Sequence, residues 1–209
     1  MTTTLFTNAH IATGEPGSTA ASTLPLQDIL VTDGVFTAFG PGLAQQYEAQ
    51  GGDLAAIEVV DLGGKLVCPP FCDTHLHLDY VFTARKPGAV NESGTLFEGI
   101  QRWCETKSDL TVDEIKQRAK IGIKKEMLHG VQLIRSHADV TDPNLTSLKA
   151  LLELKEELKD TVTLQIVSFP QEGMYSYEGP HGESGAELVE EGLKMGADCV
   201  GGIPHFEQC

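Results

Sequence analysis

Residues 66–79 form a mostly apolar run that ends in a His-x-His pair: Leu66-Val67-Cys68-Pro69-Pro70-Phe71-Cys72-Asp73-Thr74-His75-Leu76-His77-Leu78-Asp79. Side chains of a β-strand alternate between its two faces, so His75 and His77 are predicted to point the same way. Two neutral imidazoles on one side provide half of the ligands of a divalent metal site. A polar loop follows, which places the pair at the C-terminal end of the strand, where barrel enzymes carry their chemistry. The alternative is a pair of surface histidines at a strand edge.

Cys68 and Cys72 precede this pair and suggest a second alternative, a structural Cys2His2 zinc site. The spacing C-x3-C-x2-H-x-H is tight, and two prolines stiffen the chain between the thiols. Four side chains of one extended strand can hardly converge on a single ion. We therefore expect both cysteines to be buried core thiols.

The composition of the chain restricts the classes of partner. Its 209 residues include 15 Lys and Arg against 30 Asp and Glu, a formal net charge of −15. This charge disfavours nucleic acids and anionic membrane surfaces as partners, but not a neutral small molecule. No apolar run approaches the ~20 residues of a membrane span, and the N-terminus lacks the features of a signal peptide. The odd number of scattered cysteines indicates free thiols in a reducing compartment, so we expect a soluble, cytoplasmic protein.

Residues 1–65 have a β pattern and are predicted to form a unit of their own. The segments 28–32 and 35–40 flank Asp33-Gly34, which is a strong hairpin-turn signal. Further short strands are expected at 55–60 and 65–68. Two small, polar stretches are predicted to be loops, 13–25 and 45–53.

From residue 66 to residue 209 predicted strands alternate with predicted helices, the pattern of a parallel sheet covered by helices. Two capping boxes mark helix starts, at Thr111 to Glu114 and at Ser184 to Glu187. Glycines are placed to end these helices, which are expected to run to about Leu128 and Gly196. A leucine stripe predicts a further helix over 145–158. After the His-x-His strand, three more strands are predicted, at 131–137, 164–169 and 199–203.

The number of strands sets the fold class. A complete eight-unit α/β barrel of the TIM type needs about 250 residues, and only four β/α units are found here. Residues 66–209 are thus predicted to form about half of a barrel, preceded by the β unit of residues 1–65. A half-barrel has exposed, apolar sheet edges that a folded monomer seldom tolerates.

Polar residues recur where each predicted strand ends, and in a parallel barrel these ends meet at one mouth. Any one of them could instead cap a helix or face solvent. Arg135 and Asp139 could line the interior or pair with each other, and Trp103 is expected in the core or in a lid. The possible mouth residues after the second to fourth strands are His137, Asp139, Gln171, Glu172, His205 and Glu207.

Several catalytic signatures are absent from the sequence. It contains no phosphate-binding G-x-x-x-x-G-K-[ST] loop, no G-x-S-x-G elbow and no G-x-G-x-x-G fingerprint. The H-x-E…P-C-x-x-C signature of the small zinc nucleobase deaminases is also missing. A deaminase of this sequence would therefore have to use a barrel metal site.

Taken together, the hairpin of residues 29–40, the segment 64–79 and the strand-end histidines resemble the amidohydrolase superfamily. Within it the chain is similar to the barrel-type cytosine deaminases, over nearly its whole length from about Leu5 to Glu207. Three stretches carry this closer similarity: Ser93-Gly94-Thr95-Leu96-Phe97-Glu98-Gly99-Ile100, Leu164-Gln165-Ile166-Val167-Ser168-Phe169-Pro170-Gln171-Glu172-Gly173 and Gly202-Ile203-Pro204-His205-Phe206-Glu207.

The resemblance implies a fold, a cofactor and a reaction. Residues 1–65 would be part of a small β-sandwich, and His75 and His77 would bind one divalent metal ion, iron or zinc. Gln171 would hydrogen-bond the amide-like edge of a pyrimidine base, because an amide side chain offers both a donor and an acceptor. The metal would activate a water molecule that attacks the ring carbon bearing the amino group, and an acid would help ammonia leave.

The resemblance also shows what this chain does not contain. In the family, the third metal histidine and the proton-shuttling glutamate follow the fifth strand. Another active-site histidine follows the sixth strand, and a metal-binding aspartate follows the eighth. The proton shuttle therefore stays unassigned here, and His205 is only a local candidate for the missing ligand.

Three hypotheses follow for this 209-residue chain. It is the N-terminal half of a metal-dependent deaminase of cytosine or a related cyclic amidine, and complete members tend to be homo-oligomers. Alternatively it is a catalytically inactive fragment that needs a partner chain to close its barrel. In the third hypothesis, two copies dimerise into one eight-stranded barrel.

Overall fold

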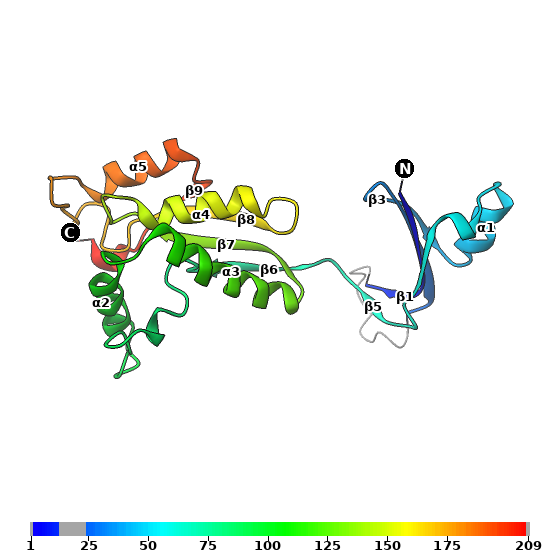
Figure 1. The fold of residues 1–209 in the computed structure, drawn as a ribbon, viewed down its shortest axis with the longest axis horizontal. Coiled ribbons are helices and arrows are strands. Elements are labelled where there is room, and N and C mark those ends of the chain that lie inside the picture. The colour runs from blue at the N-terminus through cyan, green and yellow to red at the C-terminus, as the bar shows by residue number, and fades with distance from the viewer. Residues whose placement is uncertain (1, 13–23, 208–209) are drawn as a thin grey trace. The chain divides into compact units, whose positions relative to one another are not determined.

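The computed structural model describes residues 2–12 and 24–207 of the chain. These divide into two compact units, residues 1–69 and residues 70–209, which are described separately (Figure 1). Within residues 2–12 and 24–207, each helix is too short or too polar to span a lipid bilayer.

In its described residues, the first unit is a mixed five-stranded sheet with one α-helix. Strand β1 is central: it pairs antiparallel with β2 and parallel with β4 and β5, and β3 pairs antiparallel with β2. The predicted hairpin is confirmed, since Asp33 and Gly34 connect β2 to β3 with positive φ angles of 49° and 77°. The strands are β1 (Thr3–Ile11), β2 (Leu26–Thr32), β3 (Val35–Gly40), β4 (Glu58–Asp61) and β5 (Leu66–Val67).

Helix α1 (Leu43–Ala49) lies where a loop was predicted over residues 45–53, so that prediction was wrong for residues 45–49. The residue before the helix, Gly42, has no side chain that could cap it. The buried carboxylate of Asp28 on β2 accepts the Leu43 N–H at 2.9 Å and the Asn8 N–H at 3.2 Å. This long-range cap leaves no signal in the local sequence. Most of the other predicted loop, residues 13–23, lies outside the described residues.

The run 66–79 is divided between the two units. Leu66 and Val67 pair with β1 as β5, whereas β6 (Phe71–Leu76) belongs to the sheet of the second unit. The division falls at Pro69 and Pro70, which lack the N–H that a strand donates to its neighbour. His77 is the first residue after β6.

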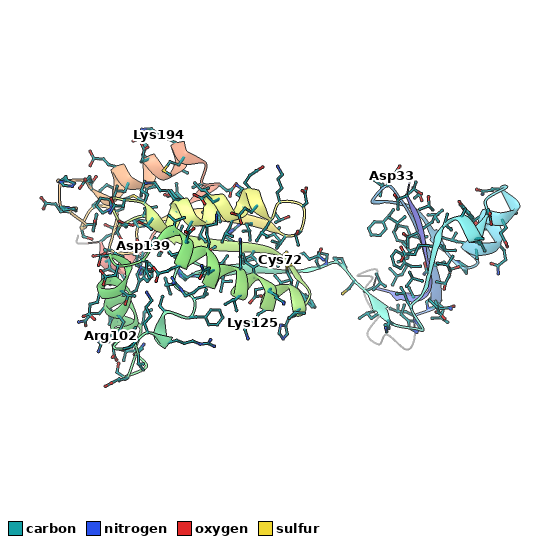
Figure 2. All side chains as sticks on the ribbon, in the orientation of Figure 1. Asp33, Cys72, Arg102, Lys125, Asp139 and Lys194 are labelled. Carbon is teal, nitrogen blue, oxygen red and sulfur yellow. The ribbon has the colours of Figure 1, made fainter. Side chains whose placement is uncertain are left out.

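Cys68 and Cys72 are exposed free thiols, so the prediction that they are core thiols was wrong. Cys68 lies in the connection between the two units. Cys72 lies on β6, an edge strand of the described sheet that is paired on one side only (Figure 2). Apolar neighbours in the sequence therefore did not imply burial.

The second unit has the predicted order of four parallel strands, β6-β7-β8-β9. Strand β9 is shorter than the predicted 199–203, and a 3-10 turn follows at Pro204–Phe206. The other strands of the sheet are β7 (Val131–Asp139), β8 (Thr163–Phe169) and β9 (Cys199–Val200). The helices are α2 (Leu96–Lys107), α3 (Val112–Leu128), α4 (Thr146–Glu157) and α5 (Gly185–Met195).

Both predicted capping boxes are present. The hydroxyls of Thr111 and Ser184 accept the N–H of Glu114 and Glu187, and each glutamate accepts the backbone N–H of its cap residue in return. Each capping box satisfies two otherwise unpaired donors at a helix start. Local sequence therefore determined where α3 and α5 begin.

The core of the second unit lies between the sheet and its helices. Helices α3 and α4 pack against each other and against β7, and α4 also packs on β8 (Figure 1). The opposite face of β7 carries Arg135, which is exposed and donates to Gln165 Oε1 on β8 at 2.5 Å. Large side chains that are fully buried in the core include Ile134, Leu148, Leu151, Leu154 and Ile166.

Gly192→Ala should destabilise the second unit, although alanine is the better helix former. A Cβ at Gly192 of α5 would overlap Ser168 Oγ on β8 and come within 3.1 Å of Leu148 Cδ2 on α4. We expect a loss of about 1–3 kcal/mol in the free energy of unfolding, measured by urea denaturation. The exposed neighbour Glu191→Ala is the control, with a change within about 0.5 kcal/mol. A Gly192→Ala chain as stable as its parent would contradict this close packing.

Candidate active site

The two histidines of the His-x-His pair lie side by side. His75 is on β6 near its C-terminal end, and its Nε2 lies 3.3 Å from Nε2 of His77. Two ligands of a tetrahedral zinc ion, each bonded at 2.0–2.1 Å, lie about 3.4 Å apart. The spacing therefore fits two ligands of one ion, as it also fits a direct hydrogen bond between the rings.

A third imidazole joins this pair from the neighbouring strand β7. The ring of His137 stacks on that of His75 with centroids 4.2 Å apart, and its centroid lies 5.4 Å from that of His77. The Nδ1 atoms of His77 and His137 are buried and have no hydrogen-bond partner in the described part of the chain. The structure thus brings one predicted mouth residue, His137, to the predicted metal ligands.

The environment of His77 and His137 favours the neutral imidazole. Burial, followed by the repulsion of His137 and His75, lowers the pKa of His77 to about 4. Burial, followed by the charge of His75, also lowers the pKa of His137. A neutral imidazole keeps the lone pair that a metal ion binds.

The fit to a metal ion is partial. His75 and His77 suit two positions around an ion. Within residues 2–12 and 24–207, no group of three or more His, Cys, Asp and Glu side chains is arranged to hold one. Catalytic zinc sites usually have three protein ligands, so this pair supplies part of a site.

Gln171 lies beside a cavity of about 370 Å³, within the size range of small-molecule pockets. It follows β8, and only 4 % of its surface is exposed. Tyr80 and Trp103 form aromatic walls of the same cavity, and α2 and the loop before it provide most of the rest. The further lining residues are Asn91, Gly94, Thr95, Leu96, Gly99 and Ile100.

A row of aromatic rings connects the histidine pair with this cavity. Tyr80 stacks on His77 with centroids 4.6 Å apart, and Trp103 lies 4.8 Å beyond Tyr80. Burial, with the nearby Asp79 and Asp139, raises the pKa of Tyr80, so its phenol stays protonated at neutral pH. The predicted metal ligands and Gln171 therefore belong to one region of the second unit.

Two other predicted mouth residues face a lysine instead of the cavity. The side chain of Asp139 is fully buried and accepts hydrogen bonds from Trp103 Nε1 at 2.7 Å and Lys107 Nζ at 3.0 Å. Glu172 also pairs with Lys107. Asp139 lies where α2 meets the strand ends (Figure 2). Arg135 pairs with Gln165, not with Asp139.

The last two strand-end residues contact α2 and the loop after β8. His205 is exposed, and its ring contacts Phe97 of α2 at a centroid distance of 5.1 Å. Glu207 accepts the N–H groups of Met174 and Tyr175, and these hydrogen bonds lower its pKa. Through these hydrogen bonds, Glu207 holds the backbone of the loop after β8.

Sequence reasoning did not identify Lys107 or the cavity wall that α2 provides. A signal was present, because Thr95, Gly99, Trp103 and Lys107 are spaced four residues apart. This spacing places them along one side of a helix. On this side of the helix, Lys107 contacts residues that lie 32 or more positions away in the chain.

Comparisons with known proteins identify the family of this chain. The family model for the amidohydrolase family matches residues 58–208. N-isopropylammelide isopropyl amidohydrolase of Pseudomonas sp. strain ADP is 35 % identical over 148 residues, which are 69 % of this chain and 36 % of the relative. Pterin deaminase of Rhizobium rhizogenes is 26 % identical over 152 residues, which are 70 % of this chain and 32 % of the relative.

Solved structures show the same relationship. The structure of 5-methylcytosine deaminase from Klebsiella pneumoniae, liganded with 5-fluorocytosine, has a TM-score of 0.80 and 40 % identity. It covers 98 % of this chain, and the chain covers 44 % of it. N-isopropylammelide isopropylaminohydrolase from Burkholderia multivorans has the same fold, with a TM-score of 0.71 at 24 % identity.

The extent of these matches confirms the predicted partial barrel. The chain spans about a third of the curated relatives' length and less than half of these solved structures. The family model nevertheless covers most of this chain, from β4 to the 3-10 turn after β9. The chain therefore belongs to the amidohydrolase family.

Proposed function

We propose that this chain is the N-terminal part of a metal-dependent enzyme that deaminates cytosine, or a related cyclic amidine, by hydrolysis and releases ammonia. The observation that carries the proposal is the facing pair of His75 and His77, joined through Tyr80 to the cavity beside Gln171. The similarity to a deaminase liganded with 5-fluorocytosine supports this choice of substrate.

The cavity suits a small planar base. Gln171 presents both a donor and an acceptor, so it can pair with a ring edge that offers an acceptor beside a donor. Tyr80 and Trp103 provide apolar surfaces that can stack on a flat ring and exclude water. A neutral base also avoids the repulsion that an anion would meet from a chain of net charge −15.

The histidines would hold the cofactor. A divalent ion, iron or zinc, supplies Lewis acidity that activates water at neutral pH when His75 and His77 bind it. The low pKa of His77 keeps its lone pair free for the ion above about pH 4. Neither the remaining ligands nor the proton-shuttling acid is assigned to a described residue.

Alanine at His75 or His77 should weaken zinc binding by the 209-residue chain. We expect a dissociation constant raised at least about tenfold, because each substitution removes one of two ligands. Equilibrium dialysis with Zn²⁺ measures this. His181→Ala is the matched control, since His181 is an exposed histidine of the loop before α5. Parent-like zinc affinity in both variants would refute the assignment of the ligands.

Gln171→Ala should weaken binding of the base, because it removes a nearly buried hydrogen-bonding group from the cavity. A loss of about 1–2 kcal/mol, roughly tenfold in affinity, is expected. The measurement is a titration of 5-fluorocytosine followed by ¹⁹F NMR, with zinc present. Gln101→Ala, at an exposed glutamine of α2, serves as the control. Equal affinity of the Gln171→Ala chain and its parent would exclude Gln171 from recognition.

A further inference from the structure

Lys107, in the last turn of α2, is enclosed by acceptors from two strand ends. Its Nζ lies 3.0 Å from Asp139 Oδ2, 2.7 Å from the Thr141 carbonyl oxygen and 3.1 Å from Thr141 Oγ1, and it also pairs with Glu172. Its side chain is only 11 % exposed. An ammonium group has three donors, so these acceptors use all of them.

The charge of this lysine is retained in spite of its burial. Burial lowers the pKa of Lys107, but the carboxylates of Asp139 and Glu172 raise it above its ordinary value. The ammonium group in turn balances the fully buried Asp139, which would be costly to leave unpaired. The second oxygen of Asp139 accepts the Thr141 N–H at 2.8 Å and the Thr141 hydroxyl at 2.6 Å.

The same network holds both walls of the cavity. On one side, Trp103 lies one helical turn before Lys107, and its Nε1 donates to the Asp139 oxygen that Lys107 also binds. On the other side, Glu172 directly follows Gln171. Lys107 therefore links the two walls of the cavity. It shares the Asp139 carboxylate with the indole of Trp103, and it pairs with the carboxylate of Glu172, which is the residue next to Gln171.

Apolar contacts alone hold α2 weakly. Of its large hydrophobic side chains, Ile100 and Trp103 are buried, whereas Leu96 and Phe97 are 70 % and 57 % exposed. The position of this helix, which provides a wall of the cavity, therefore depends strongly on the polar contacts at its C-terminal end.

We propose that Lys107 is a positioning residue for the cavity, which fixes the indole of Trp103 and the amide of Gln171 relative to each other. The part of this inference that concerns a bound base rests on the proposed function. The part that concerns Trp103 does not require a ligand.

Tryptophan fluorescence tests the ligand-independent part, because Trp103 is the only tryptophan of the chain. In Lys107→Met the indole should lose its fixed environment, so its emission should shift to the red and acrylamide should quench it more strongly. The matched control is Lys116→Met. Lys116 pairs with Glu153 and Glu157 between α3 and α4, and none of these residues lines the cavity. Parent-like emission and quenching in a folded Lys107→Met chain would overturn the proposal.

Binding of 5-fluorocytosine tests the part that rests on the proposed function. We expect Lys107→Met to weaken binding about tenfold, since a small misplacement of positioned groups is costly, and Lys116→Met to leave it unchanged. If the parent chain binds no 5-fluorocytosine while the Lys107→Met emission shifts, binding of the base by this chain is refuted and the positioning role of Lys107 toward Trp103 stands. If the parent binds and Lys107→Met matches it in emission and affinity, only the positioning role fails.

If Lys107→Met shows no cooperative unfolding in a thermal melt, that variant is not folded, and a second variant tests the proposal. Glu172 is 32 % exposed, so Glu172→Gln should fold, and it removes the charge that pairs with Lys107 next to Gln171. Weaker binding of 5-fluorocytosine with unchanged Trp103 emission would support the inference. If the parent chain binds 5-fluorocytosine, parent-like binding by this variant would overturn the part of the proposal that concerns Gln171.

Discussion

The parallel pairing of β7 with β6 and β8 is the constraint on which the candidate site depends. Its register places His137 beside Val167 and Asp139 beside Phe169, so the C-terminal ends of the strands meet at one edge. The pairing of β6 brings His75 and His77 to that edge, and Gln171 follows the end of β8. Helices α3 and α4 stabilise this arrangement because they pack on the core-facing side of β7 and β8 and bury it.

The same edge of the sheet also buries charged side chains. A buried carboxylate such as Asp139 costs free energy unless a partner compensates it, and Lys107, Trp103 and Thr141 provide the partners. The charges within this network make directional contacts, so they hold α2 in one position more specifically than apolar packing would. The same edge thus contains the histidines proposed to bind a metal ion and the charged cluster proposed to hold the cavity wall.

Pro69 and Pro70 divide the apolar run of residues 66–79 into two segments that belong to different sheets. Before them, β5 completes the sheet of the first unit, and after them β6 begins the sheet that carries the histidines. Neither proline can donate a backbone hydrogen bond, so neither sheet can continue through them. The exposed Cys68 and Cys72 on either side of them show that this connection is not part of a core.

The sequence by itself determined the features that arise from contacts within one or two turns of the chain. These are the alternation of strands and helices, the capping boxes at Thr111 and Ser184, the hairpin turn and the His-x-His pair. Only the tertiary structure decided which polar residue meets which, because Asp28 caps α1 from 15 residues away and Lys107 meets partners 32 and 65 residues away. Periodicity and capping patterns report local geometry, whereas a long-range partner is defined by the packing of whole elements. For that reason the His-x-His pair could be singled out from the sequence as candidate metal ligands, while the lysine proposed to hold the cavity wall could not.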